Sequence, residues 1–257
     1  MGKDRAGFLG LFGPDQMLKR WERALQTRAG LAPRDLAGLR REMLGVRSRI
    51  DRLSAEAETE LLARSAGQDG IARPDQCDWA ERGGPWRARL TPRGHVGFGS
   101  PLAIGAGVTL FHDATRSDLS LRQEPARRDA TGPVFALVLE VYRFDGSFLS
   151  LVQDLPDAAL QGLTLDHFFQ VHLTMDREQP IEVYARLNIQ HGPNHEQIVR
   201  QFAFDGDRGL AEFDLAYSRI NEKRVEKGWL DLILEGPEMN RVAIRDMVVL
   251  RAPRADI

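Results

Sequence analysis

The sequence predicts a mainly β protein in which a jelly-roll-like antiparallel β-sandwich follows an N-terminal helical arm. Three observations predict this fold class. A heptad-spaced apolar stripe marks the arm, ten short strand-like segments separated by turns follow from residue 86, and residues 181–190 alternate apolar and polar side chains without a break. We expect the helical arm to span residues 1–65, a turn-rich linker to span 66–78, and the sandwich to span 79–257.

The arm contains two predicted helices, over residues 16–28 and 33–64. Apolar residues in the second helix recur at alternating spacings of 3 and 4, which is a heptad a/d pattern formed by Leu36, Leu39, Met43, Val46, Ile50, Leu53 and Ala57. Two hypotheses fit this pattern. One is a short coiled coil that makes a homo-oligomer through residues 34–64, and the other is an amphipathic helix that lies on its own domain.

The predicted strands are short and are separated by turn signals, a layout typical of sandwiches and barrels. They span residues 86–91, 108–112, 119–123, 134–144, 148–154, 168–175, 181–190, 198–204, 229–234 and 242–251. Asp145-Gly146 predicts a hairpin between the two strands that flank it. Residues 134–142 are apolar on both faces, so a second layer must cover the outer face, and the N-terminal helices are candidates. A charged stretch within residues 213–227 predicts a helical interruption.

The alternating strand supplies the candidate binding residues. Side chains of a strand point to opposite faces in turn, so residues 181–190 present one apolar face and one face that carries Glu182, Tyr184, Arg186 and Asn188. Sugars are bound by aromatic rings that stack on their C–H faces and by polar groups that hydrogen-bond their hydroxyls.

Asn194 and His195, at the end of the same element, complete this set of candidate ligand-binding residues. Trp79 and Trp86 are candidates for a further aromatic platform. The alternative is a solvated sheet face with ordinary cross-strand pairs.

Composition limits the function classes. The net charge of -2 argues against nucleic-acid binding, which needs a basic excess to neutralise phosphates. Residues 1–65 carry a net charge of +4 and the remainder -6, which suggests an acidic partner for the arm. Cys77 is the only cysteine, so neither an intramolecular disulfide nor a cysteine-based metal cluster can form. The sequence has no apolar run of about 18 residues that predicts a membrane span. We expect a cytoplasmic protein, or part of a particle assembled in the cytoplasm.

Two acidic residues raise the question of a metal. Asp246 falls in register with the inward-facing residues of its predicted strand, so it requires a partner: calcium, an arginine, or a bulge that turns it outward. Asp205 begins a segment like a calcium loop, yet Ala216 stands where the bidentate glutamate belongs, which favours a hairpin turn. We expect no cofactor, with calcium as the alternative.

Catalytic motifs are weak. His191 and His195 have the spacing of a helical zinc pair, but Gly192-Pro193 prevents a continuous helix. A polysaccharide hydrolase or lyase would need two facing carboxylates with a histidine, and the only candidates are Glu182, Asp231 and His191. We expect a non-catalytic protein.

Two resemblances add to these patterns. An apolar strand, a turn and a closing strand over residues 229–254 resemble the last two strands of galactose-binding-type jelly-roll carbohydrate-binding modules. The segments Arg186-Leu-Asn-Ile-Gln-His-Gly-Pro-Asn194, Phe213-Asp-Leu-Ala-Tyr217 and 229–246 resemble an alphaproteobacterial family catalogued as a domain of unknown function. This second resemblance implies no activity or catalytic residue.

The leading hypothesis is therefore a binding module that recognises a glycan or another surface polymer through the polar sheet face. The alternative is a structural assembly protein, such as a spike-like component of a phage-derived particle, in which the helix makes the oligomer.

Overall fold

The computed structural model describes residues 14–65, 70–105, 107–126 and 132–254. The chain divides into two compact units, residues 1–58 and 59–257. In the part of the chain that is described, no helix is long and apolar enough to cross a membrane.

The first unit is a helical hairpin. It consists of α1 (Pro14–Gln26), the 3-10 turn η1 (Arg28–Gly30) and most of α2 (Pro33–Ser65), which confirms both predicted helices. Pro33 begins α2 because its fixed φ suits the first helical turn, where its missing N–H is not needed. Arg20 of α1 donates to Glu42 of α2 at 3.0 Å. None of the side chains described between residues 18 and 54 is buried, so this stretch of the unit forms no core of its own.

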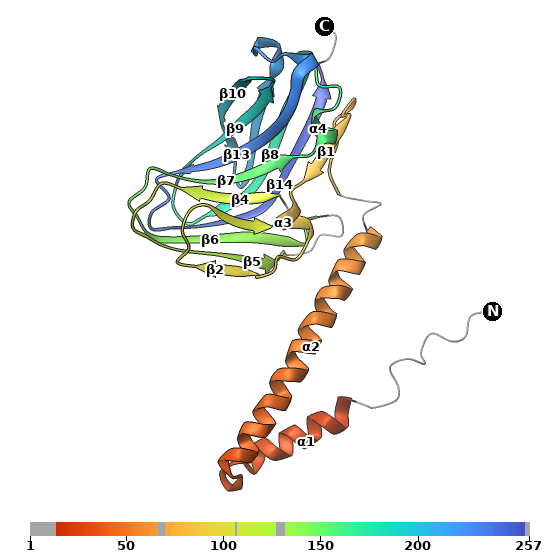
Figure 1. Cartoon of the computed structure of the whole chain (residues 1–257), viewed down its shortest axis with the longest axis vertical. Coiled ribbons are helices and arrows are strands. Elements are labelled where there is room, and N and C mark those ends of the chain that lie inside the picture. Colours follow the sequence, from red (N-terminus) through yellow and green to blue (C-terminus); the bar gives the residue numbers. More distant parts are fainter. Residues whose placement is uncertain (1–13, 66–69, 106, 127–131, 255–257) are drawn as a thin grey trace, which may run out of the picture. The chain divides into compact units, whose positions relative to one another are not determined.

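The second unit is an antiparallel β-sandwich, as predicted (Figure 1). Sheet A has the strand order β11-β12-β8-β14-β6-β5-β2, with β1 also paired to β14, and sheet B has the order β10-β9-β13-β7-β4-β3. The strands of sheet A are β1 (Trp79–Arg82), β2 (Gly94–Val96), β5 (Ser117–Pro125), β6 (Phe135–Phe144), β8 (His167–Arg177), β11 (Ala203–Asp205), β12 (Arg208–Asp214) and β14 (Asn240–Pro253). Those of sheet B are β3 (Leu102–Gly105), β4 (Val108–His112), β7 (Phe148–Leu155), β9 (Glu182–His191), β10 (Asn194–Gln201) and β13 (Val225–Glu235).

The core lies between the two sheets and follows the two-residue period of the strands. Sheet B contributes Val183, Ala185, Leu187 and Ile189 from β9 and Leu230, Leu232 and Leu234 from β13, whereas sheet A contributes Phe169, Val171 and Leu173 from β8. The alternate residues of β9 and β13 therefore point away from the core. The polar residues of β9 therefore lie on the outer face of sheet B.

Short helical turns complete the unit: α3 (Gly84–Arg87), α4 (Asp157–Leu160), η2 (Leu215–Tyr217) and η3 (Glu222–Arg224). The last two form the interruption expected within residues 213–227. Helix α3 contacts both β6 and β14. Strand β6 is buried on both faces over Phe135–Leu139, as its sequence predicts.

Three local predictions were wrong. Residues 86–91 do not form a strand, because Trp86 lies in α3, fully buried, with its indole nitrogen donating to the Ile244 carbonyl at 2.9 Å. Asp145-Gly146 does not close a hairpin, since β6 belongs to sheet A and β7 to sheet B. The predicted strand 198–204 is two strands that separate at Phe202, with β10 in sheet B and β11 in sheet A.

Asp246 has both of the features that the sequence offers as alternatives to calcium, a bulge and an arginine partner. A register shift between Ile244 and Asp246 marks a β-bulge in β14, which turns the Asp246 carboxylate out of the core. Arg82 then binds this carboxylate through two hydrogen bonds of 2.7 and 3.0 Å. Asp205 ends β11 and pairs with Arg208, and Gly206 and Asp207 form the turn of the β11–β12 hairpin, with Gly206 at φ +62°.

Candidate functional site

The outer face of sheet B carries a groove of about 550 Å³. Four neighbouring strands line it: Thr109 and Phe111 from β4; Phe148, Ser150, Val152 and Asp154 from β7; Lys227, Trp229 and Asp231 from β13; and Arg186 from β9. Strand register aligns these side chains in rows across the sheet. One row joins Arg186, Asp231, Val152 and Thr109, and the next joins Asn188, Trp229 and Asp154.

Trp229 forms the aromatic side of the groove. Its indole stacks on the imidazole of His195 with the ring centroids 4.8 Å apart and the planes 22° apart. His195 lies on the edge strand β10 and is not among the residues that line the groove. It supports Trp229 by stacking on one face of the indole, and the Lys227 ammonium lies 5.6 Å from the indole centroid.

A hydrogen-bonded network forms the polar part of the floor. The Arg186 Nε donates to the Asp231 carboxylate at 2.5 Å, and the Asn188 amide donates to the same oxygen, Oδ2, at 3.1 Å. Gln197 on β10 in turn donates to the Asn188 side-chain oxygen at 3.1 Å. Because the Asp231 side chain is only 2% exposed, it needs these donors, while Arg186 remains 37% exposed at the groove.

Phe111 and Phe148 form a second aromatic group at the far end. Phe111 is the register partner of Ser150, and Phe148 lies two residues before Ser150 on the same face of β7. Both rings are exposed, whereas the Ser150 hydroxyl is buried and has no hydrogen-bond partner among the residues that the structure describes. From strand spacing and rise, the α-carbons of Trp229 and Phe111 are roughly 16 Å apart, so the groove has apolar surfaces at both ends.

The six residues predicted from the alternating strand have different positions. Arg186 lines the groove, Asn188 lies beneath it with 0% exposure, and His195 supports Trp229. Tyr184 and Glu182 share the same sheet face but lie beyond the groove, as the register places them opposite Ile233 and Glu235.

Glu182 and Tyr184 hydrogen-bond each other outside the groove. Glu182 accepts a hydrogen bond of 2.5 Å from the Tyr184 hydroxyl and raises the pKa of Tyr184 to about 12. Asn194 is exposed at the β9–β10 turn, outside the groove.

The sequence analysis did not predict most of the residues that line the groove, although the sequence of β13 indicates two of them. In Trp229-Leu-Asp-Leu-Ile-Leu the apolar leucines alternate with Trp229, Asp231 and Ile233, which predicts a second outward face like that of β9. The proposed tryptophan platform was wrong. Trp86 is in the core and Trp79 is in β1 of sheet A.

The residues nominated for hydrolysis do not meet. Register places Glu182 and Asp231 four residues apart along the sheet, or about 13 Å. His191 is buried, and its Nδ1 accepts a hydrogen bond from the Asn221 backbone at 3.2 Å. Within the described residues, no group of three or more histidine, cysteine or acidic side chains is arranged to hold a metal.

The whole chain, residues 1–257, matches a family described as "Family of unknown function (DUF6478)". The chain belongs to this family. No curated protein matches it.

The solved structures that resemble parts of the chain include three of different kinds. The family 11 carbohydrate-binding module from Clostridium thermocellum, in complex with a β-1,3-1,4-mixed-linked tetrasaccharide, has 9% identity and a TM-score of 0.39, over 63% of this chain and 98% of that one. A cyclase from Fischerella sp. TAU has 12% identity and a TM-score of 0.41, over 69% of this chain and 100% of that one.

The third is the enzymatically active domain of bacteriophage CBA120 tailspike protein 4, with 9% identity and a TM-score of 0.39, over 56% of this chain. The chain spans about a fifth of the length of that domain's chain, at 19%. Likenesses of this size carry no information about ligand or activity, so any function rests on this chain's own residues.

Proposed function

We propose that this member of the family is a non-catalytic binding module that recognises a glycan or another hydroxyl-rich surface polymer in the groove of sheet B. The observation that carries the proposal is the combination of a braced tryptophan with the Arg186–Asp231 pair in one groove. A rigid indole offers a flat apolar surface for the C–H face of a sugar ring, and prior stacking on His195 lowers the entropy lost on binding.

The polar groups suit hydroxyls. The Nε of Arg186 donates to Asp231, so the other guanidinium N–H groups of this groove-lining residue can serve as donors to a ligand, and Thr109 adds a hydroxyl. The cations Arg186 and Lys227 are balanced by Asp231 and Asp154 among the lining residues. This balance favours a neutral polymer over a strongly anionic one.

Binding of the full-length chain to an array of neutral and acidic glycans tests the proposal. We expect Trp229→Ala to weaken binding of any hit about tenfold, since one aromatic stacking contact contributes roughly 1.5 kcal/mol. Tyr142→Ala is the matched control, because Tyr142 is an aromatic residue with 54% exposure on β6 of the other sheet. An array without a hit, or equal affinities for wild type and Trp229→Ala, would exclude the proposal.

A further inference from the structure

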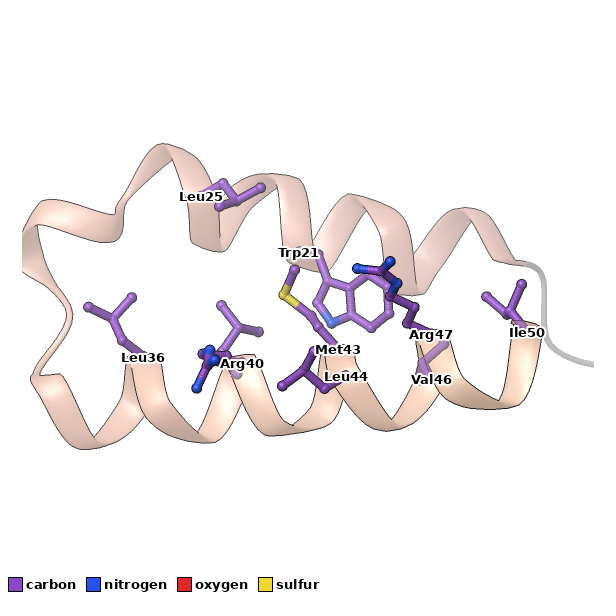
Figure 2. Close-up of a pocket in the computed structure, with 10 residues that line it drawn as sticks. Trp21, Leu25, Leu36, Arg40, Met43, Leu44, Val46, Arg47 and Ile50 are labelled. Atoms are coloured by element: carbon purple, nitrogen blue, oxygen red, sulfur yellow. The ribbon is translucent and has the colours of Figure 1, made fainter. Parts of the chain in front are cut away.

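The helical unit exposes apolar side chains that a stable fold would cover. Figure 2 shows Trp21 and Leu25 of α1 facing Leu36, Met43 and Ile50 of α2 across an open groove of about 500 Å³. Among the hairpin side chains that the structure describes, six large apolar ones are exposed, namely Leu18, Leu25, Leu36, Leu44, Ile50 and Leu53. A two-helix unit of this size, in which no side chain described between residues 18 and 54 is buried, is below the limit at which a core stabilises a domain, so its apolar face requires a partner.

The apolar stripe of α2 has the heptad spacing of helices that pair between two chains. It is most exposed toward the C-terminal half of α2, at Ile50 with 56% and Leu53 with 60%. In an antiparallel pair of heptad helices, a positions of one helix meet d positions of the other. Two copies of α2 would then place Val46 beside Ile50 and Met43 beside Leu53, with α1 of each chain flanking the pair, because Trp21 and Leu25 line the same groove as Met43 and Ile50.

The charge distribution along α2 favours a second copy of α2 as the partner, in antiparallel orientation. Residues 33–54 contain six arginines and three acidic residues, a net charge of +3, whereas residues 55–65 contain three glutamates and one arginine, a net charge of -2. Two parallel copies would place like charges together. Two antiparallel copies place the acidic third of each helix beside the basic part of the other, which is favourable.

We propose that the helical hairpin is a dimerisation element in which α2 pairs in antiparallel orientation with α2 of a second copy of this chain. The 33 residues of α2 extend for about 50 Å, long enough for a continuous interface. This proposal is independent of the ligand of sheet B and stands whether or not the groove binds a glycan.

Light scattering of the full-length chain over a dilution series tests the proposal. We expect a mass of twice 28.8 kDa that falls to the monomer value at low concentration. Ile50→Glu and Leu53→Glu should each give monomers with unchanged β-sheet circular dichroism. Both positions are exposed in the single chain, so the substitutions should lower the stability of the monomer little. The control variant Ser48→Glu changes an exposed position on the side of α2 opposite the apolar stripe, and it should remain a dimer.

The orientation has its own test. In a Cys77→Ser background, a spin label at Arg34→Cys should give a distance of about 40 Å within an antiparallel dimer, because the partner's copy of that residue lies at the opposite end of the pair. A parallel dimer would bring the labels close together and would overturn the antiparallel arrangement. A wild-type chain that stays monomeric at every concentration would overturn the dimer, and would indicate that the apolar face packs on another protein or on the β unit.

Discussion

Replacing Arg186 by alanine tests whether the floor of the groove is an interdependent network. The substitution removes the guanidinium whose Nε lies 2.5 Å from Asp231 and leaves that carboxylate, 2% exposed, with the Asn188 amide as its remaining side-chain donor. Breaking one partner of a fully buried ion pair costs about 3–5 kcal/mol. Arg186 is 37% exposed, so water can enter the space it leaves and solvate the carboxylate, and the expected cost is lower, about 2 kcal/mol.

The measurement is chemical and thermal unfolding of the full-length chain. A loss of 2 kcal/mol in a unit of this length corresponds to a decrease of about 6 °C in the melting temperature. The double variant Arg186→Ala/Asp231→Asn should recover at least 1 kcal/mol relative to the sum of the single variants, because a neutral amide does not need the cation. If the two substitutions are additive to within about 0.5 kcal/mol, the residues do not act as a pair and the network interpretation is wrong.

Other predictions concern the frame of the β unit. Gly146→Ala should destabilise it by more than 1 kcal/mol, because an added Cβ would lie 2.7 Å from a backbone nitrogen of the facing loop, whereas Gly99→Ala, with open space around it, should be neutral in the same denaturation assay. Burial raises the pKa of Asp78, but the hydrogen bonds and charge of Arg251 outweigh this and lower it overall. Asp78 therefore stabilises the fold above its unfolded pKa of about 4 and loses this contribution as the pH falls through the lower folded value. An acid titration of unfolding should show a smaller loss in Asp78→Asn than in wild type. Trp86→Phe should cost about 1–3 kcal/mol in urea unfolding, because it removes a buried hydrogen bond of 2.9 Å and part of a core side chain.

The sequence determined the local features of this protein. The period of two in residues 181–190 fixes which side chains of β9 face outward, and Arg186 and Asn188 point away from the core as that period requires. The heptad spacing and Pro33 likewise fix the start and the apolar face of α2. These features depend on residues that are neighbours along the chain.

Only the tertiary structure decided which of these faces meet. Arg186 and Asp231 are 45 residues apart, and they become partners because β9 pairs with β13 in one register among many. Asp145-Gly146 has the sequence of a hairpin turn, yet the chain crosses there to the other sheet, since a turn signal does not specify the sheet that receives the next strand. Strand pairing joins residues that are far apart in the sequence, and it depends on burial of the whole core. The pairing adopted places Trp229 beside His195 and creates the groove.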